Sequence, residues 1–351
     1  MSKHIAIDFG TSNTLIYSKE KGIIFNQPSV VAIDNNINKV LTVGNEAQQM
    51  IGKTPTNISV IKPFRYGSID KFNIAIRMLK MMIDHTKEGN RFSKAFAKAH
   101  VLVGVPSMIT QVESKGIEEV IRESGAKKVI LIKDVIADAV SLGEDIFKPI
   151  ISFIVDIGGG TTDIAAISLG GILAEESIKI GSNDIDVAIM HYIKTAYNVE
   201  IGELTAENVK IQLADAMIEK EKSAEVIGQD LASGLPITLE LNNYEIYEAI
   251  KTPIETICYS VKTVLENCPP ESVADILSRG IILTGGGSKL RNLDKLLKRE
   301  LGITAVLIDT PEFSTINGLG ALLNNMNTIH NMIIEYKPYI TRSSLQNEEQ
   351  E

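Results

Sequence analysis

The chain has 351 residues, which is long for a single hydrophobic core, so two domains are the first expectation. A formal net charge of −9 argues against a nucleic-acid partner held by bulk electrostatics, and no apolar run reaches the ~20 residues that a membrane-spanning helix requires. Two cysteines, Cys258 and Cys268, are too few for a disulfide framework, and the first apolar run ends too early, at Asp8, for a signal peptide.

The first predicted element is a β-hairpin. An apolar run that begins at Ile5 meets Asp8, and a second apolar run follows a short polar turn. Glycine lets backbone amides approach a phosphate closely, and small polar side chains add donors. The turn residues are Gly10, Thr11, Ser12 and Asn13. Beside phosphates, Asp8 would hold Mg²⁺ through the ion's waters.

Helix-like and strand-like runs alternate after this hairpin, which indicates an α/β fold. Apolar residues at three- and four-residue steps predict a helix over residues 68–86. The elements expected next are a buried strand at 99–106, a helix at 110–125, a strand at 129–132 and the start of a helix at 136–142.

A second hairpin at residues 153–163 repeats the pattern of the first. Its strand contains Asp156, and its turn and return strand contribute Gly158, Gly159, Gly160, Thr161, Thr162 and Asp163. Two such hairpins facing each other would clamp a polyphosphate. The alternative is a pair of ordinary hairpins with Asx turns, but the repetition favours the clamp.

The second half of the chain continues the alternation. The expected elements are helices at 185–197 and 205–218, a strand at 237–241, a long helix at 244–266 with Pro253 near an early turn or a break, and a strand at 281–284 before a helix at 290–301. The glycines at 285–287 would lie against an adenine or the α-phosphate, or would form a plain turn. Residues 337–351 are predicted to be disordered.

Two common nucleotide motifs are excluded. Gly52-Lys53-Thr54 is not a P-loop, because that motif needs a glycine at the position of Ala47. The dinucleotide fingerprint of spaced glycines is also missing around Gly285.

Together these motifs resemble the superfamily of actin, sugar kinases and heat-shock chaperone ATPases and, more narrowly, MreB, the bacterial actin. The resemblance covers residues 5 to about 323, and its most specific segments are IDFGTSNTLIY at 7–17, DIGGGTTDIAAISLGGI at 156–172 and LTGGGSKLRNLD at 283–294. It implies an α/β actin-like ATPase fold of two related domains, each with a small insertion subdomain, and ATP or ADP with Mg²⁺ in the cleft between them.

The resemblance also implies subdomain bounds. These are residues 1–32, 66–143 and about 312–336 for IA, 33–65 for IB, 144–181 and 243–311 for IIA, and 182–242 for IIB.

Roles carry over by motif. The resemblance implies that Asp8 and the first turn hold the β- and γ-phosphates, that Asp156 and the second turn form the facing clamp, and that Asp8 and Asp156 hold Mg²⁺ through water. Its ribose and adenine edge would be Glu207 and Lys210, which otherwise read as a solvated i,i+3 pair. The adenosine side would be closed by Gly285, Gly286, Gly287 and Ser288.

The chain departs from the family where hydrolysis should occur. Relatives usually show two acidic residues and then proline, and the second acid positions the attacking water. Here the segment begins with Lys133 and Asp134 and lacks the proline. Because a carboxylate must reach the water, the shorter side chain predicts weak ATP hydrolysis. The residues expected to handle the water are Asp134, Thr161, Thr162 and Asp163. Residues 315–320 also differ from the run of small residues that the family shows at the hinge between its two domains.

A membrane contact is a further expectation. Residues 89–98, expected to join a helix to a strand, carry Phe92 and Phe96 among three basic residues, which would suit a shallow anchor on an anionic bilayer. The alternative is that both rings fold beneath their own loop.

The resemblance implies a cytoplasmic filament protein, peripheral to the inner face of the cell membrane, that governs cell shape, and in wall-less relatives helicity and swimming. Its partners would be copies of itself in head-to-tail protofilaments that pair antiparallel, paralogous bacterial actins and an anionic membrane surface, but no nucleic acid. The rival interpretation is a monomeric small-molecule kinase of the same superfamily, for which no sugar-binding motif is found. A chaperone-type ATPase would need a peptide-binding domain after the ATPase.

Overall fold

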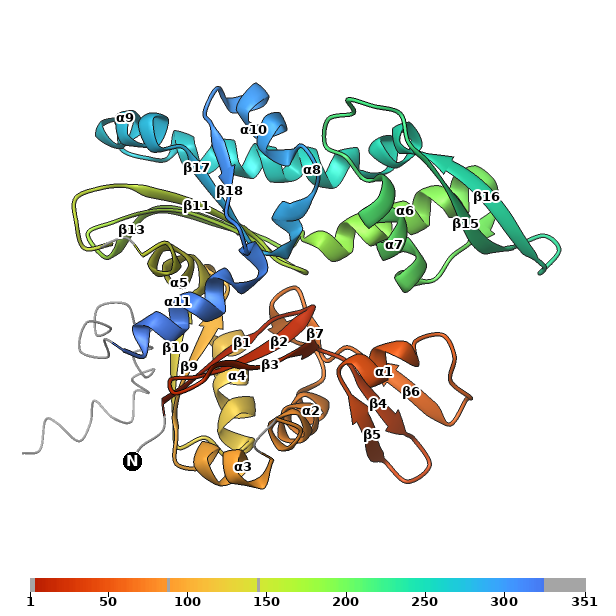
Figure 1. The fold of residues 1–351 in the computed structure, drawn as a ribbon, viewed down its shortest axis with the longest axis horizontal. Helices are drawn as coiled ribbons and strands as arrows, with labels where there is room; N and C mark the ends of the chain where they lie inside the picture. The colour runs from red at the N-terminus through yellow and green to blue at the C-terminus, as the bar shows by residue number, and fades with distance from the viewer. Residues whose placement is uncertain (1–3, 87–88, 144–145, 325–351) are drawn as a thin grey trace, which may run out of the picture.

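Two five-stranded sheets of the same topology organise the molecule, which a computed structural model describes over residues 4–86, 89–143 and 146–324 (Figure 1). The first sheet has the order β10-β9-β1-β2-β3, with β1 His4–Phe9, β2 Asn13–Ser18, β3 Gly22–Pro28, β9 His100–Val105 and β10 Lys128–Lys133. The second has the order β13-β12-β11-β17-β18, with β11 Ser152–Ile157, β12 Thr162–Ser168, β13 Gly171–Ile178, β17 Ile281–Thr284 and β18 Ala305–Leu307.

Each sheet combines an antiparallel meander with two parallel strands. In the first, β1, β2 and β3 pair antiparallel, while β9 and β10 run parallel to β1. In the second, β11, β12 and β13 pair antiparallel, while β17 and β18 run parallel to β11. Both hairpins predicted from the repeated motif are therefore present, and each begins one copy of a duplicated unit.

The helices of the first half cover one face of its sheet. They are α2 Phe72–Asp84, α3 Asn90–Phe96 and α4 Gln111–Glu123. Helix α2 is shorter than predicted, because Ser68 and Ile69 form strand β8 opposite β7 Phe64–Arg65. Helix α4 begins at a capping box, in which the Thr110 hydroxyl accepts from the Glu113 amide and the Glu113 carboxylate accepts from the Thr110 amide.

The second half carries longer helices around its own core. They are α6 Ser182–Tyr197, α7 Glu203–Leu213, α8 Asn243–Glu266, α9 Pro270–Arg279 and α10 Leu293–Leu301, with 3₁₀ turns at Gly286–Lys289 and Pro311–Phe313. Helix α8 continues through Pro253, which lies well inside its 24 residues, so the predicted early turn or break is wrong. The buried side chains of Ile250, Ile254 and Ile257 hold the helix against the core on both sides of the proline.

Each half also carries a small inserted unit, seen at the right of Figure 1. In the first half it consists of β4 Val31–Asp34, β5 Lys39–Val43, α1 Asn45–Gln49 and β6 Ile58–Ile61. In the second half it contains β14 Val199–Glu200, β15 Ser223–Asp230 and β16 Pro236–Asn242 beside α6 and α7. Strand β15 was not predicted, because its apolar positions are interrupted by Glu225, Gly228 and Gln229.

The two halves meet where helix α5 Asp134–Ser141 crosses helix α11 Ser314–Leu322. The backbones lie so close that a Cβ on Gly318 would come 1.7 Å from the Ala137 carbonyl oxygen. A hydrophobic cluster joins residues of both sheets around this crossing, among them Ala6, Leu102, Ile154, Ile316 and Leu319. The crossing therefore fixes how the edges of the two sheets face each other.

Candidate functional site

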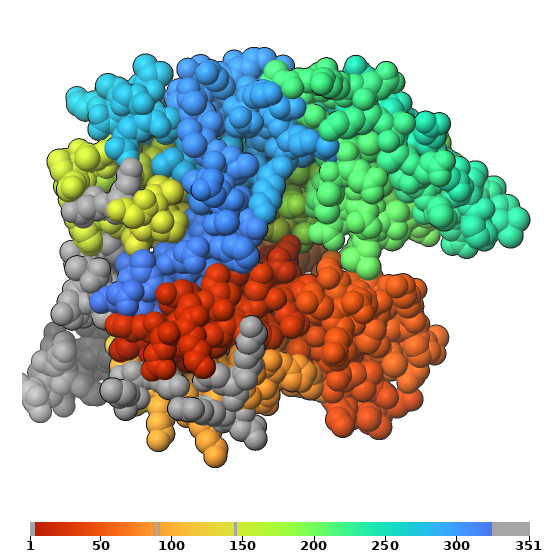
Figure 2. All heavy atoms as spheres, viewed as in Figure 1, coloured from red at the N-terminus to blue at the C-terminus, as the bar shows by residue number. Residues whose placement is uncertain are grey.

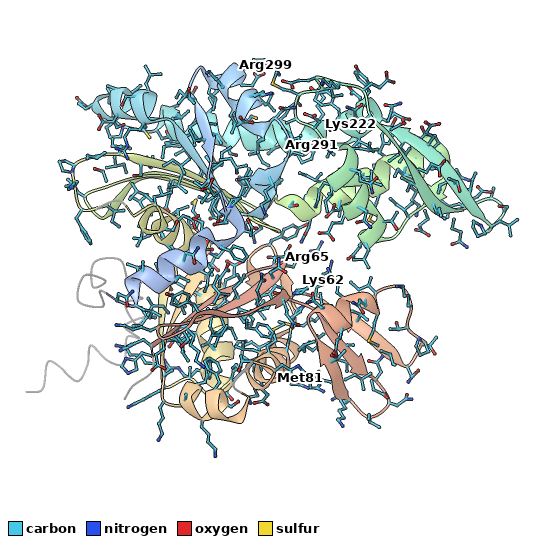
Figure 3. All side chains as sticks on the ribbon, viewed as in Figure 1. Lys62, Arg65, Met81, Lys222, Arg291 and Arg299 are labelled. Atoms are coloured by element: carbon cyan, nitrogen blue, oxygen red, sulfur yellow. The ribbon has the colours of Figure 1, made fainter. Side chains whose placement is uncertain are left out.

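A cleft with a cavity of about 550 Å³ lies between the two halves. Figure 2 shows the surface hollowed between the orange residues of the first half and the green residues of the second. Its lining includes Thr11, Ser12, Asn13, Lys62, Arg65, Gly160, Asn183, Asp186 and Glu207. Lys62 and Arg65 lie on the cleft side of the first half in Figure 3, and Lys62 pairs at 2.5 Å with Glu203 of the second half.

The two glycine turns have the same internal hydrogen bond. The Gly10 amide donates to the Asn13 carbonyl at 3.0 Å, and the Gly158 amide donates to the Thr161 carbonyl at 2.9 Å. Each half of the molecule therefore contributes one turn that is closed by the same backbone hydrogen bond.

These turns also face each other across the cleft. A Cβ on Gly159 would lie 1.9 Å from Ser12 Oγ, and one on Gly160 would lie 2.8 Å from Thr11 Oγ1. The Ser12 hydroxyl donates to Asn183 Oδ1 at 3.2 Å, which adds a polar link between the halves. Glycine is thus required at the second turn, because any side chain would push the turns apart.

Buried carboxyl groups collect behind the turns. Burial, and then the charge of Asp138, raises the pKa of Asp8 to about 7. Burial also raises the pKa values of Asp134 and Asp156 well above their ordinary range, and the neighbouring carboxylates, including Asp163, add to both shifts. Such a concentration of buried negative charge favours a cation or protons among these groups.

A hydrated Mg²⁺ fits this cluster better than a directly ligated metal does. Within the described residues, no three His, Cys, Asp or Glu side chains lie close enough together to hold an ion by themselves. Mg²⁺ keeps several of its waters and takes further ligands from phosphates. Asp8 and Asp156, each one strand residue away from a turn that can hold phosphate, would bind it through such waters.

The Asp134 carboxyl group can lie in this cluster because Gly104 of β9 has no side chain and leaves room for it. In the strand register, Gly104 lies between Asp8 of β1 and Ile132 of β10. A Cβ on Gly104 would lie 2.3 Å from Asp134 Oδ1. That oxygen is buried and accepts no hydrogen bond from any described residue.

The other predicted hydrolysis residues differ in their positions. Asp163 lies directly opposite Asp156 in the sheet and accepts from the Ser107 amide at 2.7 Å. The hydroxyl of Thr162 donates to the Ile180 carbonyl at 2.8 Å, so it is committed to holding the strand. Thr161 forms the carbonyl end of the second turn and adds a side-chain hydrogen bond to Asp163.

Sequence reasoning missed two polar residues of this region. Ser107 follows β9, and its buried hydroxyl has no hydrogen-bond partner among the described residues. The signal was available, because the loop after β9, which runs parallel to β1, lies at the same sheet edge as Asp8. Asp138 is fully buried in an otherwise apolar helical segment, and it accepts from Thr284 at 2.7 Å and from Thr315 at 2.9 Å.

Of the residues predicted for the adenosine side, only some line the cavity. Glu207 lines the cavity, whereas the Lys210 ammonium donates to the Ser182 carbonyl at 3.0 Å and to Asp186 at 2.8 Å. The segment Gly285–Ser288 lies behind Asp156, since a Cβ on Gly285 would lie 2.2 Å from Asp156 Oδ1. Most of this segment belongs to the 3₁₀ turn Gly286–Lys289, and helix α10 begins at Leu293, later than the predicted 290.

The proposed membrane residues are buried. Phe92 and Phe96 are each 1% exposed, lie on helix α3 where a loop was expected, and pack in the core of the first half. This placement corresponds to the alternative in which both rings fold beneath their own segment, so neither ring reaches a bilayer in this conformation. In the described part of the chain, none of the helices has both the length and the hydropathy to cross a bilayer.

The molecule has two sheets of identical topology, each with an inserted unit, and paired glycine turns at the cleft between them. These features define the actin-like ATPase fold. Solved structures support this class. MreB5 of Spiroplasma citri bound to ADP has a TM-score of 0.87 and 33% identity, over 94% of this chain and 99% of that chain. The same protein bound to AMPPNP gives a TM-score of 0.88 over the same shares. A chain of the MamK double helical filament, at 20% identity and a TM-score of 0.77 over 92% of this chain and 99% of its own, shares the fold.

The chain belongs to the MreB/Mbl family. The family model described as MreB/Mbl protein matches residues 2–331. The cell shape-determining protein Mbl of Bacillus subtilis (strain 168) is 42% identical over 93% of this chain and 98% of its own length. The cell shape-determining protein MreB of Escherichia coli (strain K12) is 42% identical over 92% of this chain and 93% of its own length.

Proposed function

We propose that this chain binds Mg-ATP in the cleft between its halves, assembles head to tail into filaments that control cell shape, and hydrolyses ATP slowly. The observation that carries the proposal is the meeting of two matched glycine turns in front of a group of buried carboxyls. Backbone amides from both turns would surround the phosphates. Bound Mg²⁺ would neutralise charge on the phosphates and on Asp8 and Asp156.

Relatives support the same assignment. The S. citri structures hold ADP and AMPPNP, the B. subtilis and E. coli relatives are named as cell shape-determining proteins, and MamK forms a double helical filament. We extend the proposal to antiparallel pairing of protofilaments, and to helical form and swimming for a chain from a wall-less cell. These extensions rest on the family resemblance alone.

Polymerisation is tested by light scattering. Addition of Mg-ATP to purified protein should raise the scattering, and EDTA should prevent the rise. A monomeric kinase would bind ATP without scattering more light, so unchanged scattering at saturating ATP would favour that rival. Calorimetry on nucleotide-stripped, folded protein supplies the binding measurement, and absence of heat with both ATP and ADP would reject the nucleotide site itself.

Hydrolysis is assigned to Asp134 as the residue that positions the attacking water, with Thr161 and Asp163 across the cleft. A misplacement of ~1 Å can cost ~10²-fold in rate, and Asp134 is one methylene shorter than glutamate. We expect Asp134→Glu to raise the rate of phosphate release and Asp134→Ala to abolish it, with ATP affinity retained in both. A release rate indifferent to both substitutions would remove Asp134 from the mechanism.

A further inference from the structure

The lysine that precedes Asp134 forms an ion pair between the two halves of the molecule. Lys133 Nζ donates to both carboxylate oxygens of Glu175, at 2.6 and 2.8 Å. Lys133 is the last residue of β10 in the first sheet, and Glu175 is on β13 in the second. The side chains are only 24% and 25% exposed, so solvent screens this pair less than it screens a surface pair.

The pair lies beside both parts of the proposed hydrolysis centre. On the first half, Lys133 is the N-cap residue of α5, and Asp134 is the first residue of that helix. On the second half, Glu175 lies opposite Ala165, two residues along β12 from Asp163, and the charge of Glu175 contributes to the raised pKa of Asp163. One ion pair thus connects the residue before Asp134 to β13, the strand that pairs with the Asp163-bearing β12.

One oxygen of the Asp134 carboxyl group, Oδ1, is buried and has no hydrogen bond to any described residue that would hold it in place. The Lys133 side chain likewise makes no capping hydrogen bond to α5. The position of the Asp134 carboxyl is therefore determined by packing against Gly104 and by where the start of α5 is anchored.

We infer that Lys133 and Glu175 are positioning residues, which hold Asp134 at the working distance from Thr161 and Asp163 by tying the start of α5 to β13. The inference rests on the proposed ATP hydrolysis and adds a determinant of its rate. Lys133 thus supplies, directly before Asp134, a cation whose partner lies on the opposite half.

The test compares phosphate release in a single turnover at saturating Mg-ATP with ATP affinity from calorimetry. The variants are Lys133→Met, Glu175→Gln and the reversed pair Lys133→Glu with Glu175→Lys. A matched control is Lys295→Met, which removes an equally short pair with Glu219, 2.6 Å long, inside the second half and far more exposed.

Each single substitution should slow phosphate release about tenfold while ATP affinity changes less than about twofold, because an interaction that only positions the reacting group affects turnover and not binding. The reversed pair should recover most of the rate, and the control should keep the wild-type rate. A second readout is hydrogen exchange over residues 134–141 in the ATP-bound protein, which should become faster in the single variants and recover in the reversed pair.

Single variants with wild-type release and exchange, or a folded reversed pair that behaves no better than the single variants, would overturn the inference while leaving the nucleotide site intact. Failure of the wild-type protein to bind ATP would instead overturn the proposed function, and this inference with it.

Discussion

At the scale of single residues, Asp138 shows how the fold holds a buried carboxyl group near the site. Asp138 is fully buried and takes hydrogen bonds from Thr284 and Thr315, which belong to the second sheet and to α11. Burial is the main cause that raises its pKa to about 6, and the hydroxyl donors limit the shift. No cation pairs with it among the described residues, so the folded protein holds this proton more tightly than the unfolded chain does.

Stability should therefore fall as pH rises. The folded pKa of about 6 exceeds the ordinary 3.8, so the folded state binds more protons between these values, and the free energy of unfolding decreases through that window. The full change is on the order of 3 kcal/mol for a shift of this size. Urea unfolding of nucleotide-free protein from pH 4.5 to 7 measures the larger part of this change, about 2 kcal/mol.

The control for this pH effect is Asp138→Asn. Its amide can still hydrogen-bond to both threonine hydroxyls but cannot ionise, so its unfolding free energy should decline less across the same range. Parallel pH curves for wild type and variant would show that Asp138 does not titrate in this window.

At the scale of elements, the crossing of α5 and α11 is the tightest contact between helices described above. Gly318 lets the α11 backbone rest on the Ala137 carbonyl, and the Ser141 and Ser314 hydroxyls hydrogen-bond at 2.8 Å at the same crossing. Both helices follow the last strand of their own sheet, so they are equivalent elements of the duplicated unit. Their separation sets the angle at which the halves can close.

Gly318→Ala should separate these helices. The new Cβ would fall 1.7 Å from a backbone oxygen, which only displacement of a helix can relieve, and overpacking of this kind costs roughly 1–3 kcal/mol or more. The matched control is Gly116→Ala in α4, where the nearest atom is 4.0 Å away and helix propensity favours alanine by up to ~1 kcal/mol. Urea unfolding that shows equal stability for both variants would contradict the packing described here.

Local sequence was sufficient to predict those helices and strands that have a clear pattern of apolar residues and turn glycines. The hairpins were found because apolar runs meet glycine turns, and the long helix α8 was found because its apolar positions repeat. The early turn or break expected at Pro253 was wrong because packing on both sides outweighs one lost hydrogen bond.

Contacts between distant segments were not predictable from the sequence. Lys133 and Glu175 are separated by 42 positions and Thr315 and Asp138 by 177, and no spacing rule joins them. The burial of Phe92 and Phe96 likewise depends on the core beneath α3 and not on their local sequence. The glycine turns were expected to face each other, but their close approach to Ser12 and Thr11 emerges only from the fold.

At the scale of the whole molecule, the proposed ATP site would require both halves at once, because each contributes one turn. Gly159→Ala places a methyl group 1.9 Å from Ser12 Oγ of the other half, while neither half alone contains a comparable clash at this position. Keeping the turns apart at a cost of ~1–3 kcal/mol should weaken ATP binding about 10- to 100-fold.

Calorimetry with ATP measures this effect of Gly159→Ala, and circular dichroism confirms that the variant is folded. Gly171→Ala serves as the control, since its new Cβ would meet Ser168 at an ordinary 3.8 Å. Unchanged ATP affinity in Gly159→Ala would mean that the turns do not close on the nucleotide together.

The place of α11 in the chain has a consequence for synthesis. Its side chains Ile316, Leu319 and Leu322 complete the apolar cluster that contains Ala6 and Leu15 of the first sheet, although the whole second half is translated in between. Domains generally fold as they leave the ribosome, from the N-terminus onward. Here the half that emerges first must wait for a helix that emerges after the other half is finished. A ribosome stalled within the second half would therefore present β1 and β2 with one face uncovered, available to neighbouring nascent chains.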